Sequence, residues 1–429
     1  MGNTAMKPPM GWNSWDCYGA AVNEEQVRAN AEYMAKHLKD YGWEYVVVDI
    51  QWFEPTAKNH WYNADAPLIM DEYGRLMPAV NRFPSAGGTS TGGTSAASDG
   101  EGFKPLADFV HGLGLKFGIH ILRGIPKQAV RQNVKIKGTN ICAAQIADFG
   151  SVCEWNGDMC GVDMAREGAQ EYYNSIFELY AEWGVDFVKV DDIARPYHKF
   201  EVEAVRRAIE NSGREMVLSL SPGAAPLAEA EHMSEYANMW RMTDDFWDGW
   251  EQLKKMFDYC RDWFPYVGEG HWPDCDMLPI GILRVCNGNG GEKTNFTEDE
   301  QSTLMSLWAM FRSPLMVGAD LPKNDAFTLS LLQNKDIIEI NQHTCGNREV
   351  YRKGNEIVWT ANGAYHTVYL ARFNVGDDEI TSEFNLSFIG IGGKVTTYEI
   401  WSGIRGSGIG KINSTIPPHG VRLYKITLE

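Results

Sequence analysis

The sequence has no long apolar run. No stretch approaches the roughly 20 apolar residues of a membrane-spanning helix, and residues 1–10 contain no apolar segment of signal-peptide length. We therefore expect a cytoplasmic protein that does not bind membranes. The eight cysteines are scattered, without the closely paired spacing of a metal site. The sequence thus predicts reduced structural thiols and no bound metal ion.

Basic residues are also scarce. The chain has 39 Lys and Arg against 57 Asp and Glu, a formal net charge of -18. Such a chain repels nucleic acid, so we expect an uncharged partner. No Gly-x-Gly-x-x-Gly motif follows the early apolar stretches, which argues against a dinucleotide-dependent dehydrogenase. With 429 residues, 44% of them hydrophobic, the chain is long enough for one large and one small domain.

Two short stretches, residues 187–192 and 240–245, each resemble a buried strand that ends in acidic residues. A glycosidase needs two carboxylates, one to attack the sugar or activate water and one to protonate the leaving oxygen. Acids at strand ends also serve as helix N-caps or face solvent in loops, so neither stretch decides the function alone. Their joint occurrence, each with a basic residue nearby, favours a catalytic pair.

Side-chain parity selects one acid from each stretch, because side chains alternate along a strand. In the first stretch Lys189 and Asp191 share a face. In the second stretch Arg241 and Asp245 share a face. We therefore predict Asp191 and Asp245, rather than the acid beside each, as the reacting carboxylates.

Short β-rich runs alternate with helical patterns over roughly the first 340 residues. Helical periodicity is clearest over 24–41, 165–183 and 298–311. We predict eight strands, over 10–12, 45–49, 116–121, 186–191, 216–221, 239–243, 266–268 and 314–318. Eight βα units predict an α/β fold, a (β/α)8 TIM barrel with its chemistry at the C-terminal strand ends. The Gly-, Ser- and Thr-rich segment 85–102 predicts a loop.

The pattern changes after about residue 341. Apolar and polar residues then alternate, interrupted by Gly and Asn, and no long helix is indicated. This pattern is typical of an antiparallel β domain. We therefore predict a catalytic barrel over residues 1–338 and a separate C-terminal β domain over residues 339–429.

Five motifs in the barrel region resemble glycoside hydrolase family 27, which contains α-galactosidases and α-N-acetylgalactosaminidases. They are Met10-Gly-Trp-Asn-Ser-Trp15, Tyr45-Val-Val-Val-Asp49, Gly114-Leu-Lys-Phe-Gly-Ile-His120, Trp183-Gly-Val-Asp-Phe-Val-Lys-Val-Asp191 and Trp272-Pro-Asp-Cys-Asp-Met-Leu278. The similarity runs in order from about residue 10 to residue 320.

The resemblance implies a (β/α)8 barrel followed by an antiparallel β-sandwich. It also implies double displacement with retention of the anomeric configuration, with Asp191 as nucleophile and Asp245 as acid/base. Lys189 beside the nucleophile would favour its charged form and bind sugar hydroxyls. The implied substrate is a small molecule or oligosaccharide with a terminal α-galactosyl-type sugar. No metal or organic cofactor is implied.

Further positions match residues that line the sugar pocket in the family. Trp15 matches an aromatic platform beside the sugar, and Asp49 matches a carboxylate that holds sugar hydroxyls. Arg241 matches a residue that contacts the C2 substituent, with an ion pair to Asp244 or Asp245 as the alternative. Asp276 and Met277 match the pocket wall.

Two departures from the α-galactosidase pattern predict altered hydroxyl recognition. Ile50 stands where α-galactosidases usually carry a second Asp, and His120 stands where they carry a pocket Tyr. His120 is thus a candidate sugar ligand, with a buried core imidazole as the alternative. Trp155 and Asn156, between the third and fourth predicted strands, are candidates for an aglycone site.

Substrate choice depends on segment 218–225. Galactosidases of the family place Glu and a larger apolar residue here, whereas galactosaminidases place Ser and Ala three apart, which leaves room for a 2-acetamido group. Ser221 and Ala224 resemble the second pattern, although a tight turn also explains small residues. The sequence favours an α-N-acetylgalactosaminidase, with α-galactosidase or the related β-L-arabinopyranosidase specificity as alternatives. A carbohydrate-binding protein with a degenerate site is the non-enzymatic alternative, and a homo-oligomer stays open.

Overall fold

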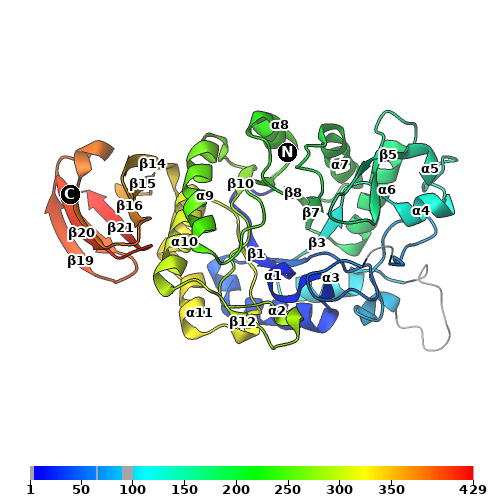
Figure 1. Cartoon of the computed structure of the whole chain (residues 1–429), viewed down its shortest axis with the longest axis horizontal. Coiled ribbons are helices and arrows are strands. Elements are labelled where there is room, and N and C mark those ends of the chain that lie inside the picture. The colour runs from blue at the N-terminus through cyan, green and yellow to red at the C-terminus, as the bar shows by residue number, and fades with distance from the viewer. Residues whose placement is uncertain (1–3, 64–65, 89–99, 429) are drawn as a thin grey trace.

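The N-terminal part of the chain forms a closed barrel of eight parallel strands. The computed structural model describes residues 4–63, 66–88 and 100–428 (Figure 1). Leu278 forms a parallel bridge with Val317, and this bridge closes the sheet between its first and last strands. The predicted (β/α)8 barrel is confirmed. In spatial order its strands are β10 (Trp272–Asp274), β9 (Met239–Arg241), β8 (Val217–Leu220), β7 (Phe187–Asp191), β3 (Lys116–Leu122), β2 (Tyr45–Val48), β1 (Met10–Asn13) and β13 (Leu315–Val317).

Helices surround the barrel (Figure 1). At the start of α2 (Glu24–His37) the Asn23 and Gln26 side chains each accept a hydrogen bond of 3.0 Å from the other's backbone N–H. Thr297 and Glu300 cap α10 (Glu298–Phe311) in the same way. The three helices predicted from periodicity correspond to α2, α6 (Ala169–Trp183) and α10. The helices of this region are α1 (Trp15–Tyr18), α2 (Glu24–His37), α3 (Lys104–Gly112), α6 (Ala169–Trp183), α7 (Lys199–Ser212), α8 (Ala230–Tyr236), α9 (Trp250–Trp263), α10 (Glu298–Phe311), α11 (Ala326–Leu332) and α12 (Lys335–His343).

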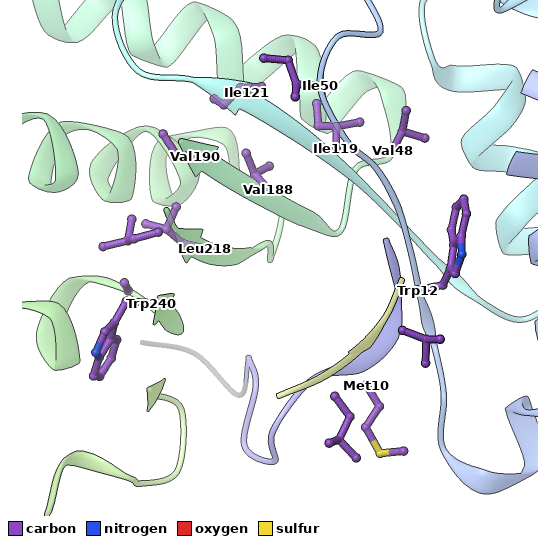
Figure 2. Close-up of a cluster of buried hydrophobic side chains, with 14 of the residues drawn as sticks. Met10, Trp12, Val48, Ile50, Ile119, Ile121, Val188, Val190, Leu218 and Trp240 are labelled. Atoms are coloured by element: carbon purple, nitrogen blue, oxygen red, sulfur yellow. The ribbon is translucent and has the colours of Figure 1, made fainter. Parts of the chain in front are cut away.

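Side chains of the barrel strands alternate between two buried layers. On β7, Phe187 packs inside the barrel, whereas Val188 and Val190 belong to the outer layer between strands and helices. Figure 2 shows this outer layer, in which Ile119 of β3 and Leu218 of β8 lie beside them. Burying one such side chain stabilises the fold by about 1.5–3 kcal/mol. On β7 the next positions inside the barrel are Lys189 and Asp191, so the strand ends in polar side chains.

One predicted strand is wrong. A 3₁₀ helix covers Phe264–Tyr266, and the barrel strand is β10, a few residues later. The sequence does not predict this strand because it contains Pro273, and proline has no backbone N–H to donate to a β-sheet hydrogen bond. The structure accommodates it opposite Trp240 of β9, at the end of the strand order. The strand predicted over 239–243 is shorter than expected, since β9 ends at Arg241.

A small antiparallel sheet between β3 and β7 was not predicted. Its short β5 reads Ala-Asp-Phe-Gly-Ser-Val, in which Gly and an acid obscure the alternation that marks a strand. The connection from β5 to β6 carries Trp155 to the mouth of the barrel. The elements of this region are β4 (Ile125–Pro126), α4 (Lys127–Gln132), α5 (Ala143–Ile146), β5 (Ala147–Val152) and β6 (Met159–Val162), and a second hairpin, β11 (Ile282–Leu283) with β12 (Glu292–Lys293), follows β10.

The C-terminal domain is antiparallel and lies beside α9 and α10 (Figure 1). Leu370, Phe384 and Ile426 pack in the core of this domain. The six-stranded sheet also packs on the barrel helices, where the rings of Phe257 and Phe373 lie 5.0 Å apart. The predicted β-sandwich is confirmed. Its larger sheet has the order β14 (Cys345–Lys353), β15 (Glu356–Asn362), β16 (Thr367–Asn374), β21 (Val421–Leu428), β18 (Lys394–Glu399) and β19 (Arg405–Ile409), and its smaller sheet pairs β17 (Ile380–Asn385) with β20 (Lys411–Ile416).

The domain boundary predicted between residues 338 and 339 falls within α12 and stays a prediction. Of the predicted loop over 85–102, residues 89–99 lie outside the described residues. Across the described parts of the chain, no helix is both long and apolar enough to cross a membrane.

Candidate active site

A cavity of about 260 Å³ opens at the C-terminal ends of the barrel strands. It is smaller than the roughly 300–1,000 Å³ pockets that bind drug-sized ligands, and its size suits one sugar unit. Of the predicted site residues, all line this cavity except His120, Asn156, Ser221 and Ala224. The lining residues are Trp15, Asp16, Asp49, Ile50, Tyr62, Trp155, Lys189, Asp191, Arg195, Pro222, Arg241, Asp244, Asp245, Phe246, Trp247, Asp276 and Met277.

One wall holds a buried lysine beside two carboxylates. Lys189 Nζ lies 2.9 Å from Asp49 Oδ2, which also accepts a hydrogen bond of 2.7 Å from Asn13 Nδ2. Burial raises the pKa of Asp49, but Lys189, His120 and Asn13 outweigh burial and hold it below the usual value. Burial lowers the pKa of Lys189, but the charges of Asp49 and Asp191 raise it above the usual value. Both groups are therefore charged at neutral pH and are suited to bind sugar hydroxyls.

Asp191 ends β7, and its carboxylate is held from two sides. Its Oδ2 lies 2.9 Å from His120 Nε2, and its Oδ1 accepts a hydrogen bond of 2.8 Å from the Asp192 backbone N–H. Burial raises the pKa of Asp191, but the hydrogen bond and charge of His120, together with Lys189, lower it to about 2. The carboxylate is thus an anion over the whole neutral and mildly acidic range.

His120 supports this carboxylate from behind the cavity. Its side chain is fully buried, and its Nδ1 has no hydrogen-bond partner among the described residues. Since an ionised carboxylate only accepts, Nε2 carries the hydrogen and donates to Asp191. Of the two alternatives for His120, the structure places it as a buried imidazole beside the candidate nucleophile.

The parity argument works for the first acidic stretch and fails for the second. Asp191 lines the cavity, whereas Asp192 faces away and accepts a hydrogen bond of 2.7 Å from Arg123 Nη2. In the second stretch Asp244 and Asp245 both line the cavity. Because β9 has already ended, the loop geometry and not strand alternation places these two acids.

Arg241 organises a second group of lining acids. Arg241 Nη2 lies 2.7 Å from Asp276 Oδ2 and 3.1 Å from Asp245 Oδ1. The Asp245 side chain is 61% exposed, whereas that of Asp191 is 12% exposed. Asp244 instead pairs with Arg195 at 3.1 Å. Asp245 therefore stands at the mouth of the cavity, whereas Asp191 lies deeper in it.

Two further buried acids, Asp274 and Asp16, lie around Asp276, and the pKa values of all three carboxyls are raised. Burial, followed by the charge of Asp276, raises the pKa of Asp274 to about 7. Burial and Asp276 also raise the pKa of Asp16 well above its usual value, and Asp16 Oδ2 has no hydrogen-bond partner among the described residues. Burial raises the pKa of Asp276 itself against the opposing charge of Arg241. Asp16 lines the cavity, so its protonated carboxyl is placed to donate a hydrogen bond to a ligand.

The loop after β8 differs from the sequence prediction. Pro222 lines the cavity, whereas Ser221 and Ala224 do not. Ser221 is fully buried, and its carbonyl accepts hydrogen bonds from the backbone of Ile193 and Ala194 at 3.1 and 3.2 Å. The predicted acetamido pocket therefore has no support from the lining of the cavity.

Sequence reasoning missed several lining residues. Asp16 follows directly after a matched motif, and its position next to Trp15 was the available signal. Tyr62, Arg195 and Trp247 come from irregular connections, which carry no periodicity that would place them. Asn156, predicted for an aglycone site, is buried and accepts a hydrogen bond from the Asp158 backbone. Within the described ranges, no group of three or more His, Cys, Asp or Glu residues could hold a metal ion.

We expect His120→Phe to move the acid limb of the kcat/KM profile to higher pH by roughly one to two units. The native pKa of Asp191 is about 2, so its carboxylate is ionised above that value. Loss of the His120 hydrogen bond raises this pKa toward the ordinary value of about 3.9 or beyond. The ionised form then disappears at higher pH. In profiles from about pH 3 to 8, the parent is expected to show no acid limb from Asp191, whereas the variant loses activity below about pH 4. A variant profile without this limb contradicts the prediction. The control is His366→Ala, at an exposed position in the C-terminal domain.

Comparisons with known proteins agree with this geometry. Family models described as "Alpha galactosidase A" and "Alpha galactosidase C-terminal beta sandwich domain" match residues 156–343 and 353–426. The chain is similar to a family 27 β-L-arabinopyranosidase of Geobacillus stearothermophilus (52% identity, 99% of this chain and 97% of that chain, TM-score 0.94). It is also similar to a putative α-N-acetylgalactosaminidase of Bacillus halodurans C-125 (51%, 98% and 97%, TM-score 0.87). Alpha-galactosidase 2 of Arabidopsis thaliana is 26% identical over 99% of this chain and 90% of that protein.

The barrel, its acidic pocket and these matches define a glycoside hydrolase. Hydrolases of this class act on glycosides, so the substrate is a sugar-containing molecule. The chain belongs to glycoside hydrolase family 27.

Proposed function

We propose that this enzyme hydrolyses terminal β-L-arabinopyranosides by double displacement, with retention of the anomeric configuration. The observation that carries the sugar assignment is Ile50 in the cavity wall beside Asp49. Asp191 is the proposed nucleophile, and Asp245 is the proposed acid/base. Trp15, Asp49, Lys189, Arg241, Asp276 and Met277 are the proposed sugar-binding residues.

Ile50 removes one hydrogen-bond acceptor from the sugar pocket. Its backbone N–H donates to Asp49 Oδ1 at 2.9 Å, which fixes the isoleucine next to the hydroxyl-binding carboxylate. A hydroxyl buried against an alkyl side chain loses its hydrogen bonds to water, at a cost of about 1–3 kcal/mol. β-L-Arabinopyranose has the ring configuration of D-galactopyranose but lacks the hydroxymethyl group at C5. An apolar wall where galactosidases carry an acid therefore favours the sugar that has one hydroxyl fewer.

Two relatives bear on this choice. The Geobacillus stearothermophilus relative is described as a β-L-arabinopyranosidase, and a variant of it is described in complex with arabinose. The Bacillus halodurans relative, at similar identity, is described as a putative α-N-acetylgalactosaminidase. Alpha-galactosidase 2 of Arabidopsis thaliana and Alpha-galactosidase A of Cellvibrio japonicus are 26% and 28% identical to this chain. Ile50 supports the arabinopyranoside over the galactosaminide, because N-acetylgalactosamine keeps the hydroxymethyl group that arabinopyranose lacks.

The proposed reaction has two steps. In the first, an oxygen of Asp191 attacks C1 of the sugar, and the bond from C1 to the aglycone oxygen breaks as Asp245 gives its proton to that oxygen. In the second, Asp245 takes a proton from water, the water oxygen attacks C1, and Asp191 leaves as a carboxylate. The low pKa of Asp191 suits both attack and departure. Burial raises the pKa of Asp244, but the ion pair with Arg195 outweighs burial and lowers this pKa below its usual value. Asp244 is therefore the poorer proton donor, which favours Asp245.

α-N-Acetylgalactosaminidase activity is the second candidate. The small residues Ser221 and Ala224 favour it, because the galactosaminidases of the family place Ser and Ala here, which leaves room for a 2-acetamido group. Against it stands the placement of Ser221 and Ala224 outside the cavity lining.

Ile50→Asp is expected to lower the preference for arabinopyranoside over galactoside by about 10- to 100-fold. The new carboxylate supplies a charged acceptor, and such a hydrogen bond is typically worth about 1.5–3 kcal/mol. The measurement is kcat/KM on 4-nitrophenyl β-L-arabinopyranoside, α-D-galactopyranoside and N-acetyl-α-D-galactosaminide, for the parent and the variant.

Ile50→Ala is the matched comparison, because it enlarges the space without adding an acceptor. A smaller shift in this variant than in Ile50→Asp attributes the selectivity to hydrogen bonding. The proposed specificity is wrong if the parent enzyme has its highest kcat/KM on the galactoside or the galactosaminide.

A further inference from the structure

Aromatic rings continue the cavity outward beyond the sugar-binding groups. The rings of Trp15 and Tyr62 are stacked, with centroids 6.0 Å apart and an interplanar angle of 15°. Tyr62 in turn contacts Trp155, at 5.4 Å and 46°. All three line the cavity, and Trp155 is 38% exposed. The three rings come from separate segments of the chain and form one apolar wall that runs from the pocket to solvent.

The loop that carries Trp155 is anchored to the cavity wall. Asp158, three residues after Trp155, accepts a hydrogen bond of 2.5 Å from the side chain of Gln51. The Asp158 carbonyl accepts a second bond, of 2.8 Å, from the backbone of Lys127. Gln51 follows directly after Ile50 in the pocket wall. The indole is therefore presented by a fixed loop, and a fixed ring binds a ligand at a lower entropic cost than a mobile one.

The position of the candidate acid indicates where the leaving group lies. The candidate acid Asp245 stands at the mouth, so the oxygen that it protonates points outward from the sugar. Tyr62 faces the same space: burial and then the charges of Asp191, Asp49 and Asp245 raise the pKa of its phenol. The protonated phenol of Tyr62 and the exposed indole of Trp155 are therefore placed to contact the aglycone.

We propose that Tyr62 and Trp155 form an aglycone subsite that stacks a flat apolar face, either that of a second pyranose ring or that of an aryl group. The assignment rests on the proposed function, since it takes Asp245 as the acid. Sugar rings and aryl groups share the chemistry that an aromatic platform recognises, namely an extended C–H or π surface. The exposed part of Trp155 supplies that surface, and contact with the Tyr62 ring fixes the orientation of the indole.

Trp155→Ala is expected to lower kcat/KM about tenfold on substrates with a flat aglycone, the size of one ring contact. The probes are the β-L-arabinopyranosyl derivatives of fluoride, of D-galactose and of phenol. Fluoride is too small to reach the subsite, so its loss is expected to be less than about threefold. A loss on the disaccharide alone identifies a sugar aglycone, a loss on the phenyl glycoside alone identifies an aryl aglycone, and a loss on both identifies a general platform.

Trp61→Ala is the matched control, because Trp61 lies in the same segment as Tyr62, is 78% exposed and does not line the cavity. It is expected to leave all three rates as in the parent, and Trp155→Phe is expected to recover most of the loss. Equal losses on fluoride and on both glycosides, or no loss on either glycoside, overturn the subsite. The same three derivatives of α-D-galactose separate this test from that of the proposed function. If the arabinose assignment is wrong, the galactosides are hydrolysed faster than the arabinopyranosides. The ratio of variant to parent kcat/KM within each series still reports on the subsite.

Discussion

Asp191→Asn is expected to lower kcat by roughly 10⁴-fold or more, equivalent to about 5 kcal/mol of lost transition-state stabilisation, and to leave sugar binding in place. The substitution removes the attacking charge and almost no volume. Lys189 keeps Asp49 as its partner at 2.9 Å, and His120 can still donate to the amide oxygen, so we expect the pocket to keep its shape. Turnover of an aryl glycoside measures the first part, and calorimetric titration with L-arabinose measures the second.

Asp192→Asn is the control for this variant. Asp192 is the neighbouring buried acid, but it faces away from the cavity and pairs with Arg123 at 2.7 Å. We expect a loss of thermal stability and a much smaller loss of turnover. If Asp192→Asn and Asp191→Asn reduce kcat equally, the charge at position 191 has no special role. Comparable turnover by Asp191→Asn and the parent would exclude this residue as the nucleophile.

Asp245→Ala is expected to show an effect that depends on the leaving group. With an activated dinitrophenyl aglycone the first step needs little protonation, so it is spared, whereas deglycosylation slows because water has lost its general base. With an alkyl aglycone the first step also slows, by about 10²- to 10⁴-fold. Pre-steady-state bursts of dinitrophenol, followed by slow turnover, would report this split.

Azide distinguishes the role of Asp245 from that of its neighbour. A small anion needs no general base, so azide is expected to restore turnover of Asp245→Ala and to give a glycosyl azide of retained configuration. Asp244→Asn is the matched variant, because Asp244 lines the same cavity, is similarly exposed and is held by Arg195. A burst and azide response in Asp244→Asn, with neither in Asp245→Ala, would transfer the acid/base role to Asp244.

The sequence predicts the barrel well because its physical signals are local. Strand and helix periodicities locate most elements. The hydrophobic cluster in Figure 2 consists of the strand side chains that point outward from the barrel, which are the alternate residues of each strand. The strand around Pro273 was misplaced because its stability comes from pairing with β9, which no local pattern records. The small β4–β6 sheet was missed for a different reason, because its strands are short and because Gly and an acid obscure the alternation in β5.

Strand alternation alone predicts site residues only where regular strands carry them, and the family resemblance adds Trp15, Asp276 and Met277. Asp49, Lys189 and Asp191 follow from their strands, and the structure brings all three to one wall. Tyr62 and Trp247 enter the cavity from irregular segments, whose paths depend on packing across the whole barrel mouth. Ser221 fits a family pattern in sequence, yet its backbone bonds to the loop after β7 and the turn presents Pro222 instead.

Covalent trapping tests the central claim most directly, namely that Asp191 attacks the sugar. The parent enzyme is incubated with a 2-deoxy-2-fluoro-β-L-arabinopyranosyl fluoride, which slows the second step, and the protein is analysed by intact mass and peptide mapping. We expect one fluorosugar per chain, bound as an ester to Asp191, with activity returning as the label is released. A label on any other residue, or full turnover of ordinary substrate to a product of inverted configuration with no label formed, would contradict the account.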